Sequence, residues 1–361
     1  MSDSNSERLQ GRAIALVSGK GGSGKTIVAA VMAKVLGLSD VAPLLVDADL
    51  GTAGLSFYLG LDLVANTTRG LSDAFRHDRN GALPSDAEIT SWIQLIKVPY
   101  PAYFLSAGDH RRYPRDISDG ALNAVFEQVI HGLKRSGEAV IVDCRGGIDN
   151  ESLAACRAVD DIILIVETDT TSFQASQYLV EVLGENNIAS KLRGFIVNKV
   201  FEDPTSIVRN GTGLFRCQCL GAIPLDLDAM RDFFSGRVPP VSSIFGKHVH
   251  FAICKGYPEA LPLPSGRPFD FREYSEVGLT NLDSVRGGIL SAMAIIMAIG
   301  FYIAAVRPGF GTFANPKLDL AVASLAVFGL LGSLNNTRKA MGRVIDVYVK
   351  VFLRLAERRR D

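Results

Sequence analysis

The sequence predicts an α/β protein with a doubly wound, mostly parallel sheet, followed by an α-helical hydrophobic hairpin and a C-terminal amphipathic helix. Short apolar runs alternate with stretches of helical spacing up to about residue 240, which is typical of a parallel sheet with helices on both faces. Two runs without a charged residue follow, at 289–306 and 320–334, and a basic stretch with helically spaced apolar residues covers 338–360.

The charge balance excludes a strongly basic or acidic protein. The 361 residues include 38 Lys and Arg and 38 Asp and Glu, so the formal net charge is zero. Such a chain has no global attraction to nucleic acid, so binding would need a local basic patch, and nucleic acid is not the expected partner. The five cysteines complete no four-ligand metal spacing, so we interpret them as reduced structural thiols. The first ten residues are polar and lack the apolar segment of a signal peptide.

A glycine-rich loop at 19–26, GKGGSGKT, lies between an apolar run at 13–17 and a stretch of helical spacing at 27–36. It fits the phosphate-binding pattern G-x-x-x-x-G-K-[ST] of P-loop NTPases in the strand–loop–helix context that this pattern requires. The glycines let backbone N–H groups point at a phosphate, and the helix N-terminus adds positive charge. We expect Lys25 to reach the β and γ phosphates and the Thr26 hydroxyl to ligate Mg²⁺. The remaining phosphate contacts are expected from Gly21, Gly22, Ser23 and Gly24.

Carboxylates follow two further predicted strands, at 42–46 and 139–143. Asp47 and Asp49 come after the first, and Asp143 ends the second. Ligands of α/β sheets bind at the carboxyl ends of the strands, although an Asp there is also a common helix N-cap. Asp143 is predicted to hold the Mg²⁺ water shell opposite Thr26, and the following residues are predicted to form a switch that senses the γ-phosphate.

Lys20, five residues before Lys25, and the D-A-D-L-G motif at 47–51 resemble the MinD/ParA group of deviant Walker A ATPases. The resemblance runs in register from about Arg12 to Pro240. It implies that Lys20 crosses a dimer interface to touch the neighbour's nucleotide. It also implies that Asp47 lies near Mg²⁺ and that Asp49 orients the attacking water.

The same resemblance implies contacts to the nucleotide base. Asn198 and Lys199 end the predicted strand that begins at Gly194, at the position where an Asn amide pairs with the edge of adenine in the family. An Asn at a strand end is also an ordinary turn residue. Pro224 belongs to the family's last strand, whose following backbone lies along the base. Arg145 departs from the D-x-P-P-G or D-x-x-x-G pattern of the family's switch.

The chain is predicted to divide into five segments. They are a disordered N-terminus at 1–11, a MinD/ParA-like ATPase domain at 12–245, a linker or irregular cap rich in Pro and Gly at 246–286, a transmembrane helical hairpin at 287–336 and a basic amphipathic helix at 337–361.

The hairpin prediction depends on the 18 uncharged residues of 289–306, which span about 27 Å as a helix, close to the thickness of a hydrocarbon core. Two buried core helices are the alternative, but a core helix rarely lacks a polar side over five turns. Basic residues after residue 337 favour the hairpin under the positive-inside rule, whereas Arg307 and Lys317 in its short loop oppose it. The stretch 338–360 fits an anionic leaflet or packing against another copy equally well.

Together these features predict a membrane-anchored ATPase on the cytoplasmic side of the inner or cell membrane, with a multi-pass hairpin. With ATP and Mg²⁺ it would form a homodimer through the nucleotide face, and it would contact lipid through 289–334. It would hydrolyse ATP slowly unless a partner stimulates it. Its role would be to control the assembly or localisation of an unknown protein partner. One alternative is a soluble partitioning or scaffold ATPase whose hairpin is an oligomer interface. Another is a membrane effector gated by nucleotide state, for example in defence against phage.

Two further classes fit poorly. A tyrosine autokinase of the polysaccharide-export type usually ends in a tyrosine cluster, whereas this chain ends in Arg358-Arg359-Arg360-Asp361. A metal-cluster carrier would need C-x-x-C, and Cys217 and Cys219 are only two residues apart.

Overall fold

The computed structural model describes residues 9–38, 41–60, 69–75, 83–96, 102–109, 113–114, 116–258 and 261. The chain separates into two units, 1–271 and 272–361, and every described residue belongs to the first. The predicted hairpin and basic helix, 287–361, lie outside the described residues. Within the described part, no helix has the length and apolar character needed to cross a membrane.

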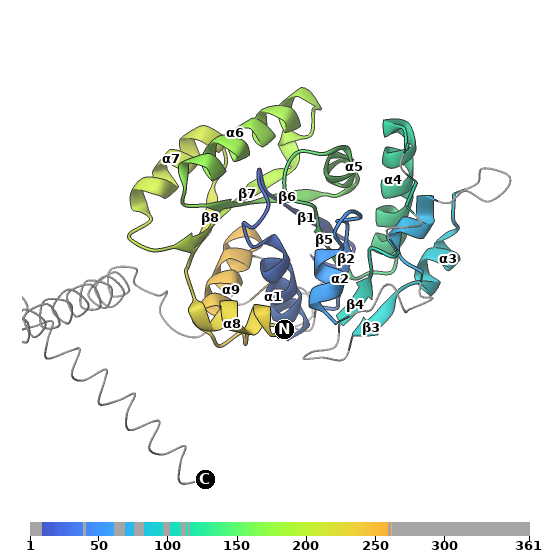
Figure 1. The fold of residues 1–361 in the computed structure, drawn as a ribbon, viewed down its shortest axis with the longest axis horizontal. Helices are drawn as coiled ribbons and strands as arrows, with labels where there is room; N and C mark the ends of the chain where they lie inside the picture. The colour runs from blue at the N-terminus through green and yellow to red at the C-terminus, as the bar shows by residue number, and fades with distance from the viewer. Residues whose placement is uncertain are drawn as a thin grey trace, which may run out of the picture. The chain divides into compact units, whose positions relative to one another are not determined.

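The described strands form one eight-stranded sheet in the order β3-β4-β2-β5-β1-β6-β7-β8 (Figure 1). Every neighbouring pair is parallel except β3 with β4. The prediction of a mostly parallel sheet is therefore confirmed. The strands are β1 (Ala13–Val17), β2 (Pro43–Asp47), β3 (Gln94–Ile96), β4 (Ala102–Leu105), β5 (Ala139–Asp143), β6 (Asp161–Glu167), β7 (Leu192–Val200) and β8 (Cys219–Pro224).

Helices cover both faces of the sheet, so the domain has three layers (Figure 1). One face carries α1 (Lys25–Gly37), α2 (Gly54–Tyr58), α8 (Leu227–Phe234) and α9 (Ile244–Gly256). The other carries α3 (Asp86–Ser91), α4 (Asp119–Arg135), α5 (Asn150–Ala158), α6 (Thr170–Glu185) and α7 (Thr205–Phe215), with short 3₁₀ segments at Leu71–Phe75 and Ala189–Lys191.

Strand β1 shows why the apolar runs locate the central strands. Ala13, Ala15 and Val17 point into the core under α4 to α7, whereas Ile14 and Leu16 point into the core under α1 and α9. A strand that is buried on both faces has no polar alternation and appears in sequence as a continuous apolar run. Strands β5 and β6 are buried on both faces in the same way. Each pairs in parallel with β1, so the carboxyl ends of the three strands lie side by side.

Helix α9 corrects the predicted end of the ATPase domain. The sequence predicts an irregular segment from residue 246, whereas Ile244–Gly256 is helical and is capped by Ser243, whose side chain accepts from the Gly246 N–H. The helix packs closely on β8, because a Cβ added to Gly221 would lie only 3.0 Å from the Ala252 Cβ. The domain therefore continues through residue 256. The Pro and Gly residues that follow 256 misled the sequence interpretation.

The predicted disordered N-terminus is also too long. Leu9 is fully buried, and the Gly11 N–H donates to the Glu138 carbonyl at 3.0 Å. The chain is thus part of the fold from residue 9 onward. Residues 1–8 lie outside the described part.

Candidate functional site

The glycine-rich loop connects β1 to α1 at the edge of the sheet where β2, β5 and β7 bring Asp47, Asp143 and Asn198. Gly22 and Gly24 have φ of 83° and 91°, a left-handed conformation that residues with a Cβ adopt only with strain. Gly24 also lacks space for a side chain, because a Cβ there would lie 2.3 Å from the Asn198 Nδ2.

Lys25 is a buried cation at the base of this loop. Only 6 % of the residue is exposed, and its Nζ donates to the Ser18 Oγ at 2.8 Å. Burial lowers the pKa of Lys25, and the negative charges of Asp143 and nearby carboxylates oppose that effect. A cation that is desolvated in this way gains from a bound anion, so the loop suits a phosphate.

Asp143 and Thr26 form the part of the site that fits a metal ion. Asp143 is 2 % exposed, the Thr26 side chain hydrogen-bonds its carboxylate, and its Oδ1 is buried with no hydrogen-bond partner among the described residues. Burial raises the pKa of Asp143 to about 6, and the Lys25 charge opposes this rise. A buried acceptor without a donor, beside a hydroxyl, is a suitable pair of ligands for Mg²⁺.

No group of three or more His, Cys, Asp or Glu within the described ranges could hold a metal by itself. Mg²⁺ often keeps several waters and binds through few carboxylates plus substrate phosphates. The donor set of Thr26 and Asp143 therefore fits a Mg²⁺ ion that arrives with a nucleotide.

Asp47 is completely buried and anchors the loop that follows β2. Its Oδ2 accepts from the Ser56 N–H and the Ser56 hydroxyl, each at 2.7 Å, and its Oδ1 accepts from the Asp49 N–H at 3.1 Å. Burial and the charge of Asp143 raise the pKa of Asp47 to about 7. The structure thus gives Asp47 a role in fixing Asp49 and Ser56, and its contact with Mg²⁺ stays a prediction. Ser56 has no sequence signal that marks it.

Asp49 is half-buried at the open side of the same loop. Its carboxylate accepts from the Thr52 N–H at 2.9 Å and from the Thr52 hydroxyl. Two residues further on, a Cβ added to Gly54 would lie 4.0 Å from the Thr26 Oγ1. The loop that carries Asp49 therefore closes over the Thr26 side of the phosphate loop, where a reacting phosphate would lie.

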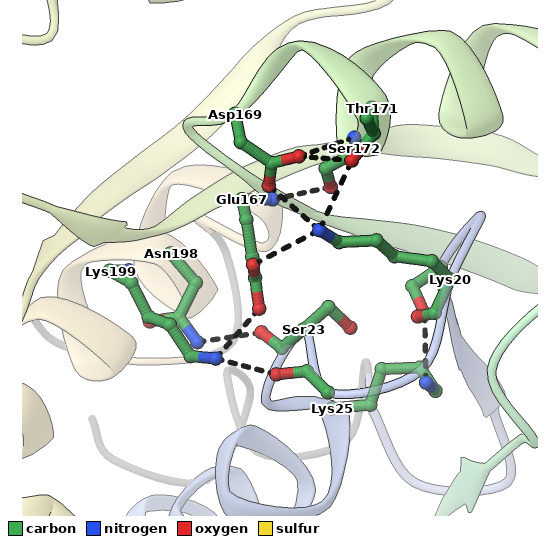
Figure 2. A network of polar contacts seen from close by, with 11 residues as sticks. Lys20, Ser23, Lys25, Glu167, Asp169, Thr171, Ser172, Asn198 and Lys199 are labelled. Carbon is green, nitrogen blue, oxygen red and sulfur yellow. Dashed lines mark hydrogen bonds and ion pairs between the residues drawn. The ribbon is translucent and has the colours of Figure 1, made fainter.

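Lys20 is bound to acidic residues of its own chain (Figure 2). Its Nζ lies 2.8 Å from the Asp169 Oδ2 and 3.5 Å from the Glu167 Oε2. The hydrogen bond to Asp169 raises the pKa of Lys20, and the same bond holds the pKa of Asp169 far below its ordinary value. Lys20 is predicted to reach the nucleotide of a partner. In the structure, the ion pairs with Asp169 and Glu167 of its own chain compete with that contact. Sequence reasoning missed Glu167, the last residue of β6, and Asp169, the N-cap of α6.

Asn198 and Lys199 brace the phosphate loop from β7 (Figure 2). The Asn198 Nδ2 donates to the Ser23 carbonyl at 2.8 Å, and the Lys199 Nζ donates to the Gly22 carbonyl at 2.6 Å. Lys199 also pairs with the Glu167 Oε1 at 2.7 Å. Both residues were predicted to contact the nucleotide base. Their contacts in the structure are to protein atoms of the phosphate loop, and the contact with the base stays a prediction.

Pro224 ends β8 beside the Val200 end of β7, at the same edge of the sheet as the loop. A hollow of about 600 Å³ lies between α6 and α7 and is lined by residues such as Phe173, Ile207 and Leu214. None of its lining residues belongs to the phosphate loop, so this hollow is separate from the candidate nucleotide site.

Comparison with known families identifies the domain that contains the phosphate loop. Residues 14–239 match the family described as the CobQ/CobB/MinD/ParA nucleotide binding domain. The chain belongs to this family. The resemblance to MinD/ParA that the sequence motifs indicate is confirmed, and so is a nucleotide-binding domain that contains all the site residues described above.

Curated relatives and solved structures agree with this assignment. An uncharacterized ATP-binding protein of Methanocaldococcus jannaschii is 27 % identical over 219 residues, which are 60 % of this chain and 76 % of that protein. The chloroplastic septum site-determining protein minD homolog of Arabidopsis thaliana is 26 % identical over 230 residues, 61 % of this chain and 66 % of that protein.

Among solved structures, the MinD cell division protein of Aquifex aeolicus has a TM-score of 0.55 at 19 % identity, covering 70 % of this chain and 99 % of that one. The septum site-determining protein MinD of Pyrococcus horikoshii, complexed with Mg-ADP, has a TM-score of 0.53 at 23 % identity, covering 67 % and 93 %. At these identities the structures establish the common fold. A relative named for ATP binding and a structure complexed with Mg-ADP agree with ATP and Mg²⁺ as the predicted cofactors.

Proposed function

We propose that this chain is a Mg²⁺-dependent ATPase that acts as a dimerisation switch and controls the assembly or localisation of a protein partner at a membrane. The proposal depends on two buried groups at one site: the Lys25 ammonium, and the Asp143 carboxylate, whose Oδ1 has no partner among the described residues and which Thr26 hydrogen-bonds. A cation without a bound anion and an acceptor without a donor are both satisfied when a nucleotide phosphate and Mg²⁺ bind together.

In this mechanism the loop amides and Lys25 hold the phosphates, and Thr26 and Asp143 would hold Mg²⁺. When bound, Mg²⁺ neutralises charge on the phosphates. Asp49 orients the attacking water, because its carboxylate lies on the open side of the loop and can accept a hydrogen bond. Lys25 stabilises the charge that develops on the transferring phosphoryl group.

Dimerisation through the nucleotide face would use Lys20. To reach a partner's nucleotide, the ammonium must leave Asp169 and Glu167, which hold it in its own chain. Its side chain is 32 % exposed, so this exchange requires no opening of the core. The triphosphate of a facing copy offers Lys20 several charged oxygens in place of the two carboxylates, and it would draw Lys20 across the interface.

The dimer test uses light scattering after gel filtration, with Asp49→Ala introduced to prevent hydrolysis. We expect a dimer with Mg-ATP and a monomer with Mg-ADP. Adding Lys20→Ala should keep the chain monomeric with ATP, whereas adding Arg231→Gln, at an exposed residue of α8, should not. A Lys20→Ala protein that dimerises as readily as its parent would exclude the role given to Lys20.

The membrane anchor is the part of the proposal that depends on sequence. The uncharged runs in 289–334 would insert as a hairpin, and 338–360 would lie on the leaflet or pack on another copy. Both ends would then stay on the cytoplasmic side of the cell membrane, where the ATPase domain meets ATP.

Membrane fractionation with a carbonate wash tests the anchor, comparing the full chain with a truncation after Ser284. We expect the full chain in the pellet and the truncated chain in the supernatant, with ATP hydrolysis retained and the fold checked by circular dichroism. A full chain that stays in the supernatant would contradict the anchor. It would favour the alternative in which the hydrophobic segment is an oligomer interface of a scaffold or partitioning ATPase.

A further inference from the structure

Arg145 lies where the two loops of the site meet. It follows Asp143 by two residues, and its guanidinium packs over Gly51 of the loop that carries Asp49. A Cβ added to Gly51 would lie 3.2 Å from the Arg145 Nη1 and 3.7 Å from the Asp49 Oδ1. The guanidinium and the Asp49 carboxylate therefore approach the same point from opposite loops.

The backbone that carries Arg145 is fixed against the phosphate loop. A Cβ added to Gly146 would lie 2.6 Å from the Gly21 Cα and 2.9 Å from the Lys20 carbonyl oxygen, distances that no side chain can adopt. The Gly147 N–H donates to the Ser18 carbonyl at 3.0 Å. These contacts hold Arg145 beside the phosphate loop rather than on an independent surface loop.

The Arg145 charge is available to a ligand. The residue is exposed, and its guanidinium donates no hydrogen bond and forms no ion pair to any residue that the structure describes. Two other cations at this edge are already engaged, because Lys20 pairs with Asp169 and Lys199 pairs with Glu167. An arginine presents a planar fork of donors that matches the oxygens of a phosphate.

We propose that Arg145 binds the terminal phosphate of ATP within its own chain, and so distinguishes a nucleoside triphosphate from a diphosphate. The inference rests on the proposed ATPase function. Lys25 marks the β and γ phosphates in a loop of this kind, and Arg145 lies on the side of that loop where Asp49 approaches. A guanidinium at this point would also stabilise the negative charge of phosphoryl transfer, as arginines do in other P-loop enzymes.

A structural role for Arg145 makes a different prediction. Asp149 caps α5, and burial raises its pKa while hydrogen bonds from Ser152 and the Arg145 charge lower it. If Arg145 only stabilised the start of α5, its loss would affect ATP and ADP binding alike. The contrast between the two nucleotides therefore separates the two roles.

The experiment measures the affinity of the full chain, in detergent micelles, for Mg-ATPγS and for Mg-ADP by calorimetry, together with single-turnover ATP hydrolysis. For Arg145→Gln we expect ATPγS affinity to fall about ten- to hundredfold, the range for one hydrogen-bonded charge, while ADP affinity stays within about twofold. Arg145→Lys should recover part of the loss, because it keeps the charge without the fork. Arg231→Gln is the matched control, an exposed arginine on α8.

The inference is overturned if Arg145→Gln binds ATPγS and hydrolyses ATP like the wild type, or if it loses affinity for both nucleotides equally. Failure of the proposed function has a different signature, since the wild type itself would then bind neither nucleotide in the presence of Mg²⁺. Because Arg145 is exposed, the substituted chains should fold, and circular dichroism confirms this before binding is measured.

Discussion

Replacing Asp49 with alanine abolishes ATP hydrolysis and leaves ATP binding intact. The carboxylate lies on the loop that closes over Thr26 and is held in place by Thr52, but it forms none of the contacts that shape the phosphate loop. Removing it therefore deprives the water of its orienting group without removing a phosphate ligand. We expect a fall in the turnover rate of at least about a hundredfold, as for loss of a water-positioning group.

The measurement is single-turnover hydrolysis with bound ATP quantified in parallel. Lys25→Ala serves as the contrasting variant, because loss of the buried phosphate-binding cation should abolish ATP binding as well as hydrolysis. Full activity in purified Asp49→Ala would remove Asp49 from the mechanism. Loss of ATP binding in Asp49→Ala would instead assign Asp49 to the binding of the nucleotide.

Replacing Asp143 with asparagine removes the stabilisation that Mg²⁺ adds to the nucleotide complex. The unpartnered Oδ1 and the adjacent Thr26 are the donors that fit the ion, and a neutral amide is a far weaker ligand for it. With ATPγS at a hundredfold excess over its dissociation constant, the wild type should gain about 2.7 kcal/mol of stability from the nucleotide and Mg²⁺. In Asp143→Asn, thermal unfolding with ATPγS should no longer depend on Mg²⁺.

The same variant predicts a pH dependence in the absence of nucleotide. Burial raises the pKa of Asp143 from its ordinary 3.8 to about 6, so the folded chain binds the proton more tightly than the unfolded chain. Stability therefore falls as pH rises through this window, and the full cost of ionisation, about 3 kcal/mol, is present above it. The amide of the Asp143→Asn variant cannot ionise. The melting temperature of the wild type should thus fall by several degrees relative to Asp143→Asn between about pH 4 and pH 7.

Asp47 reinforces this trend, because its pKa is raised in the same direction and partly by Asp143. The control is Asp86→Asn, at a half-buried residue whose ion pair with Arg135 is open to solvent. A difference in melting temperature between wild type and Asp143→Asn that does not change with pH would show that the carboxylate is already ionised at low pH.

Local sequence determined the parts of the site that depend on neighbours in the chain. The loop between β1 and α1 requires glycines at fixed positions and a lysine and a threonine at the helix start, so its residues appear together and in order. Asp47, Asp143 and Asn198 were found because each ends or follows a buried strand. Parallel strands bring such ends to one edge of the sheet, which makes their proximity predictable without coordinates.

Only the tertiary structure decided which groups at that edge are already occupied. Asn198 and Lys199, expected at the base, bond to carbonyls of the phosphate loop, and Lys20 is held by Asp169, 149 positions away in sequence. Pairing between distant side chains leaves no local pattern, because it depends on how β6, β7 and the loop are placed in space.

The boundaries of the domain were likewise predicted where they depend on local sequence and missed where they depend on tertiary packing. Strand β1 was located correctly because burial on both faces makes every residue apolar. Helix α9 was missed because the Pro-rich segment that follows it drew the predicted boundary forward, and its packing on Gly221 of β8 shows that it belongs to the domain. Sequence by itself thus determined the fold class, the phosphate loop and the residues at the strand ends. Tertiary structure decided their partners and placed Arg145 over Gly51, because those contacts join segments that are close only after the sheet has formed.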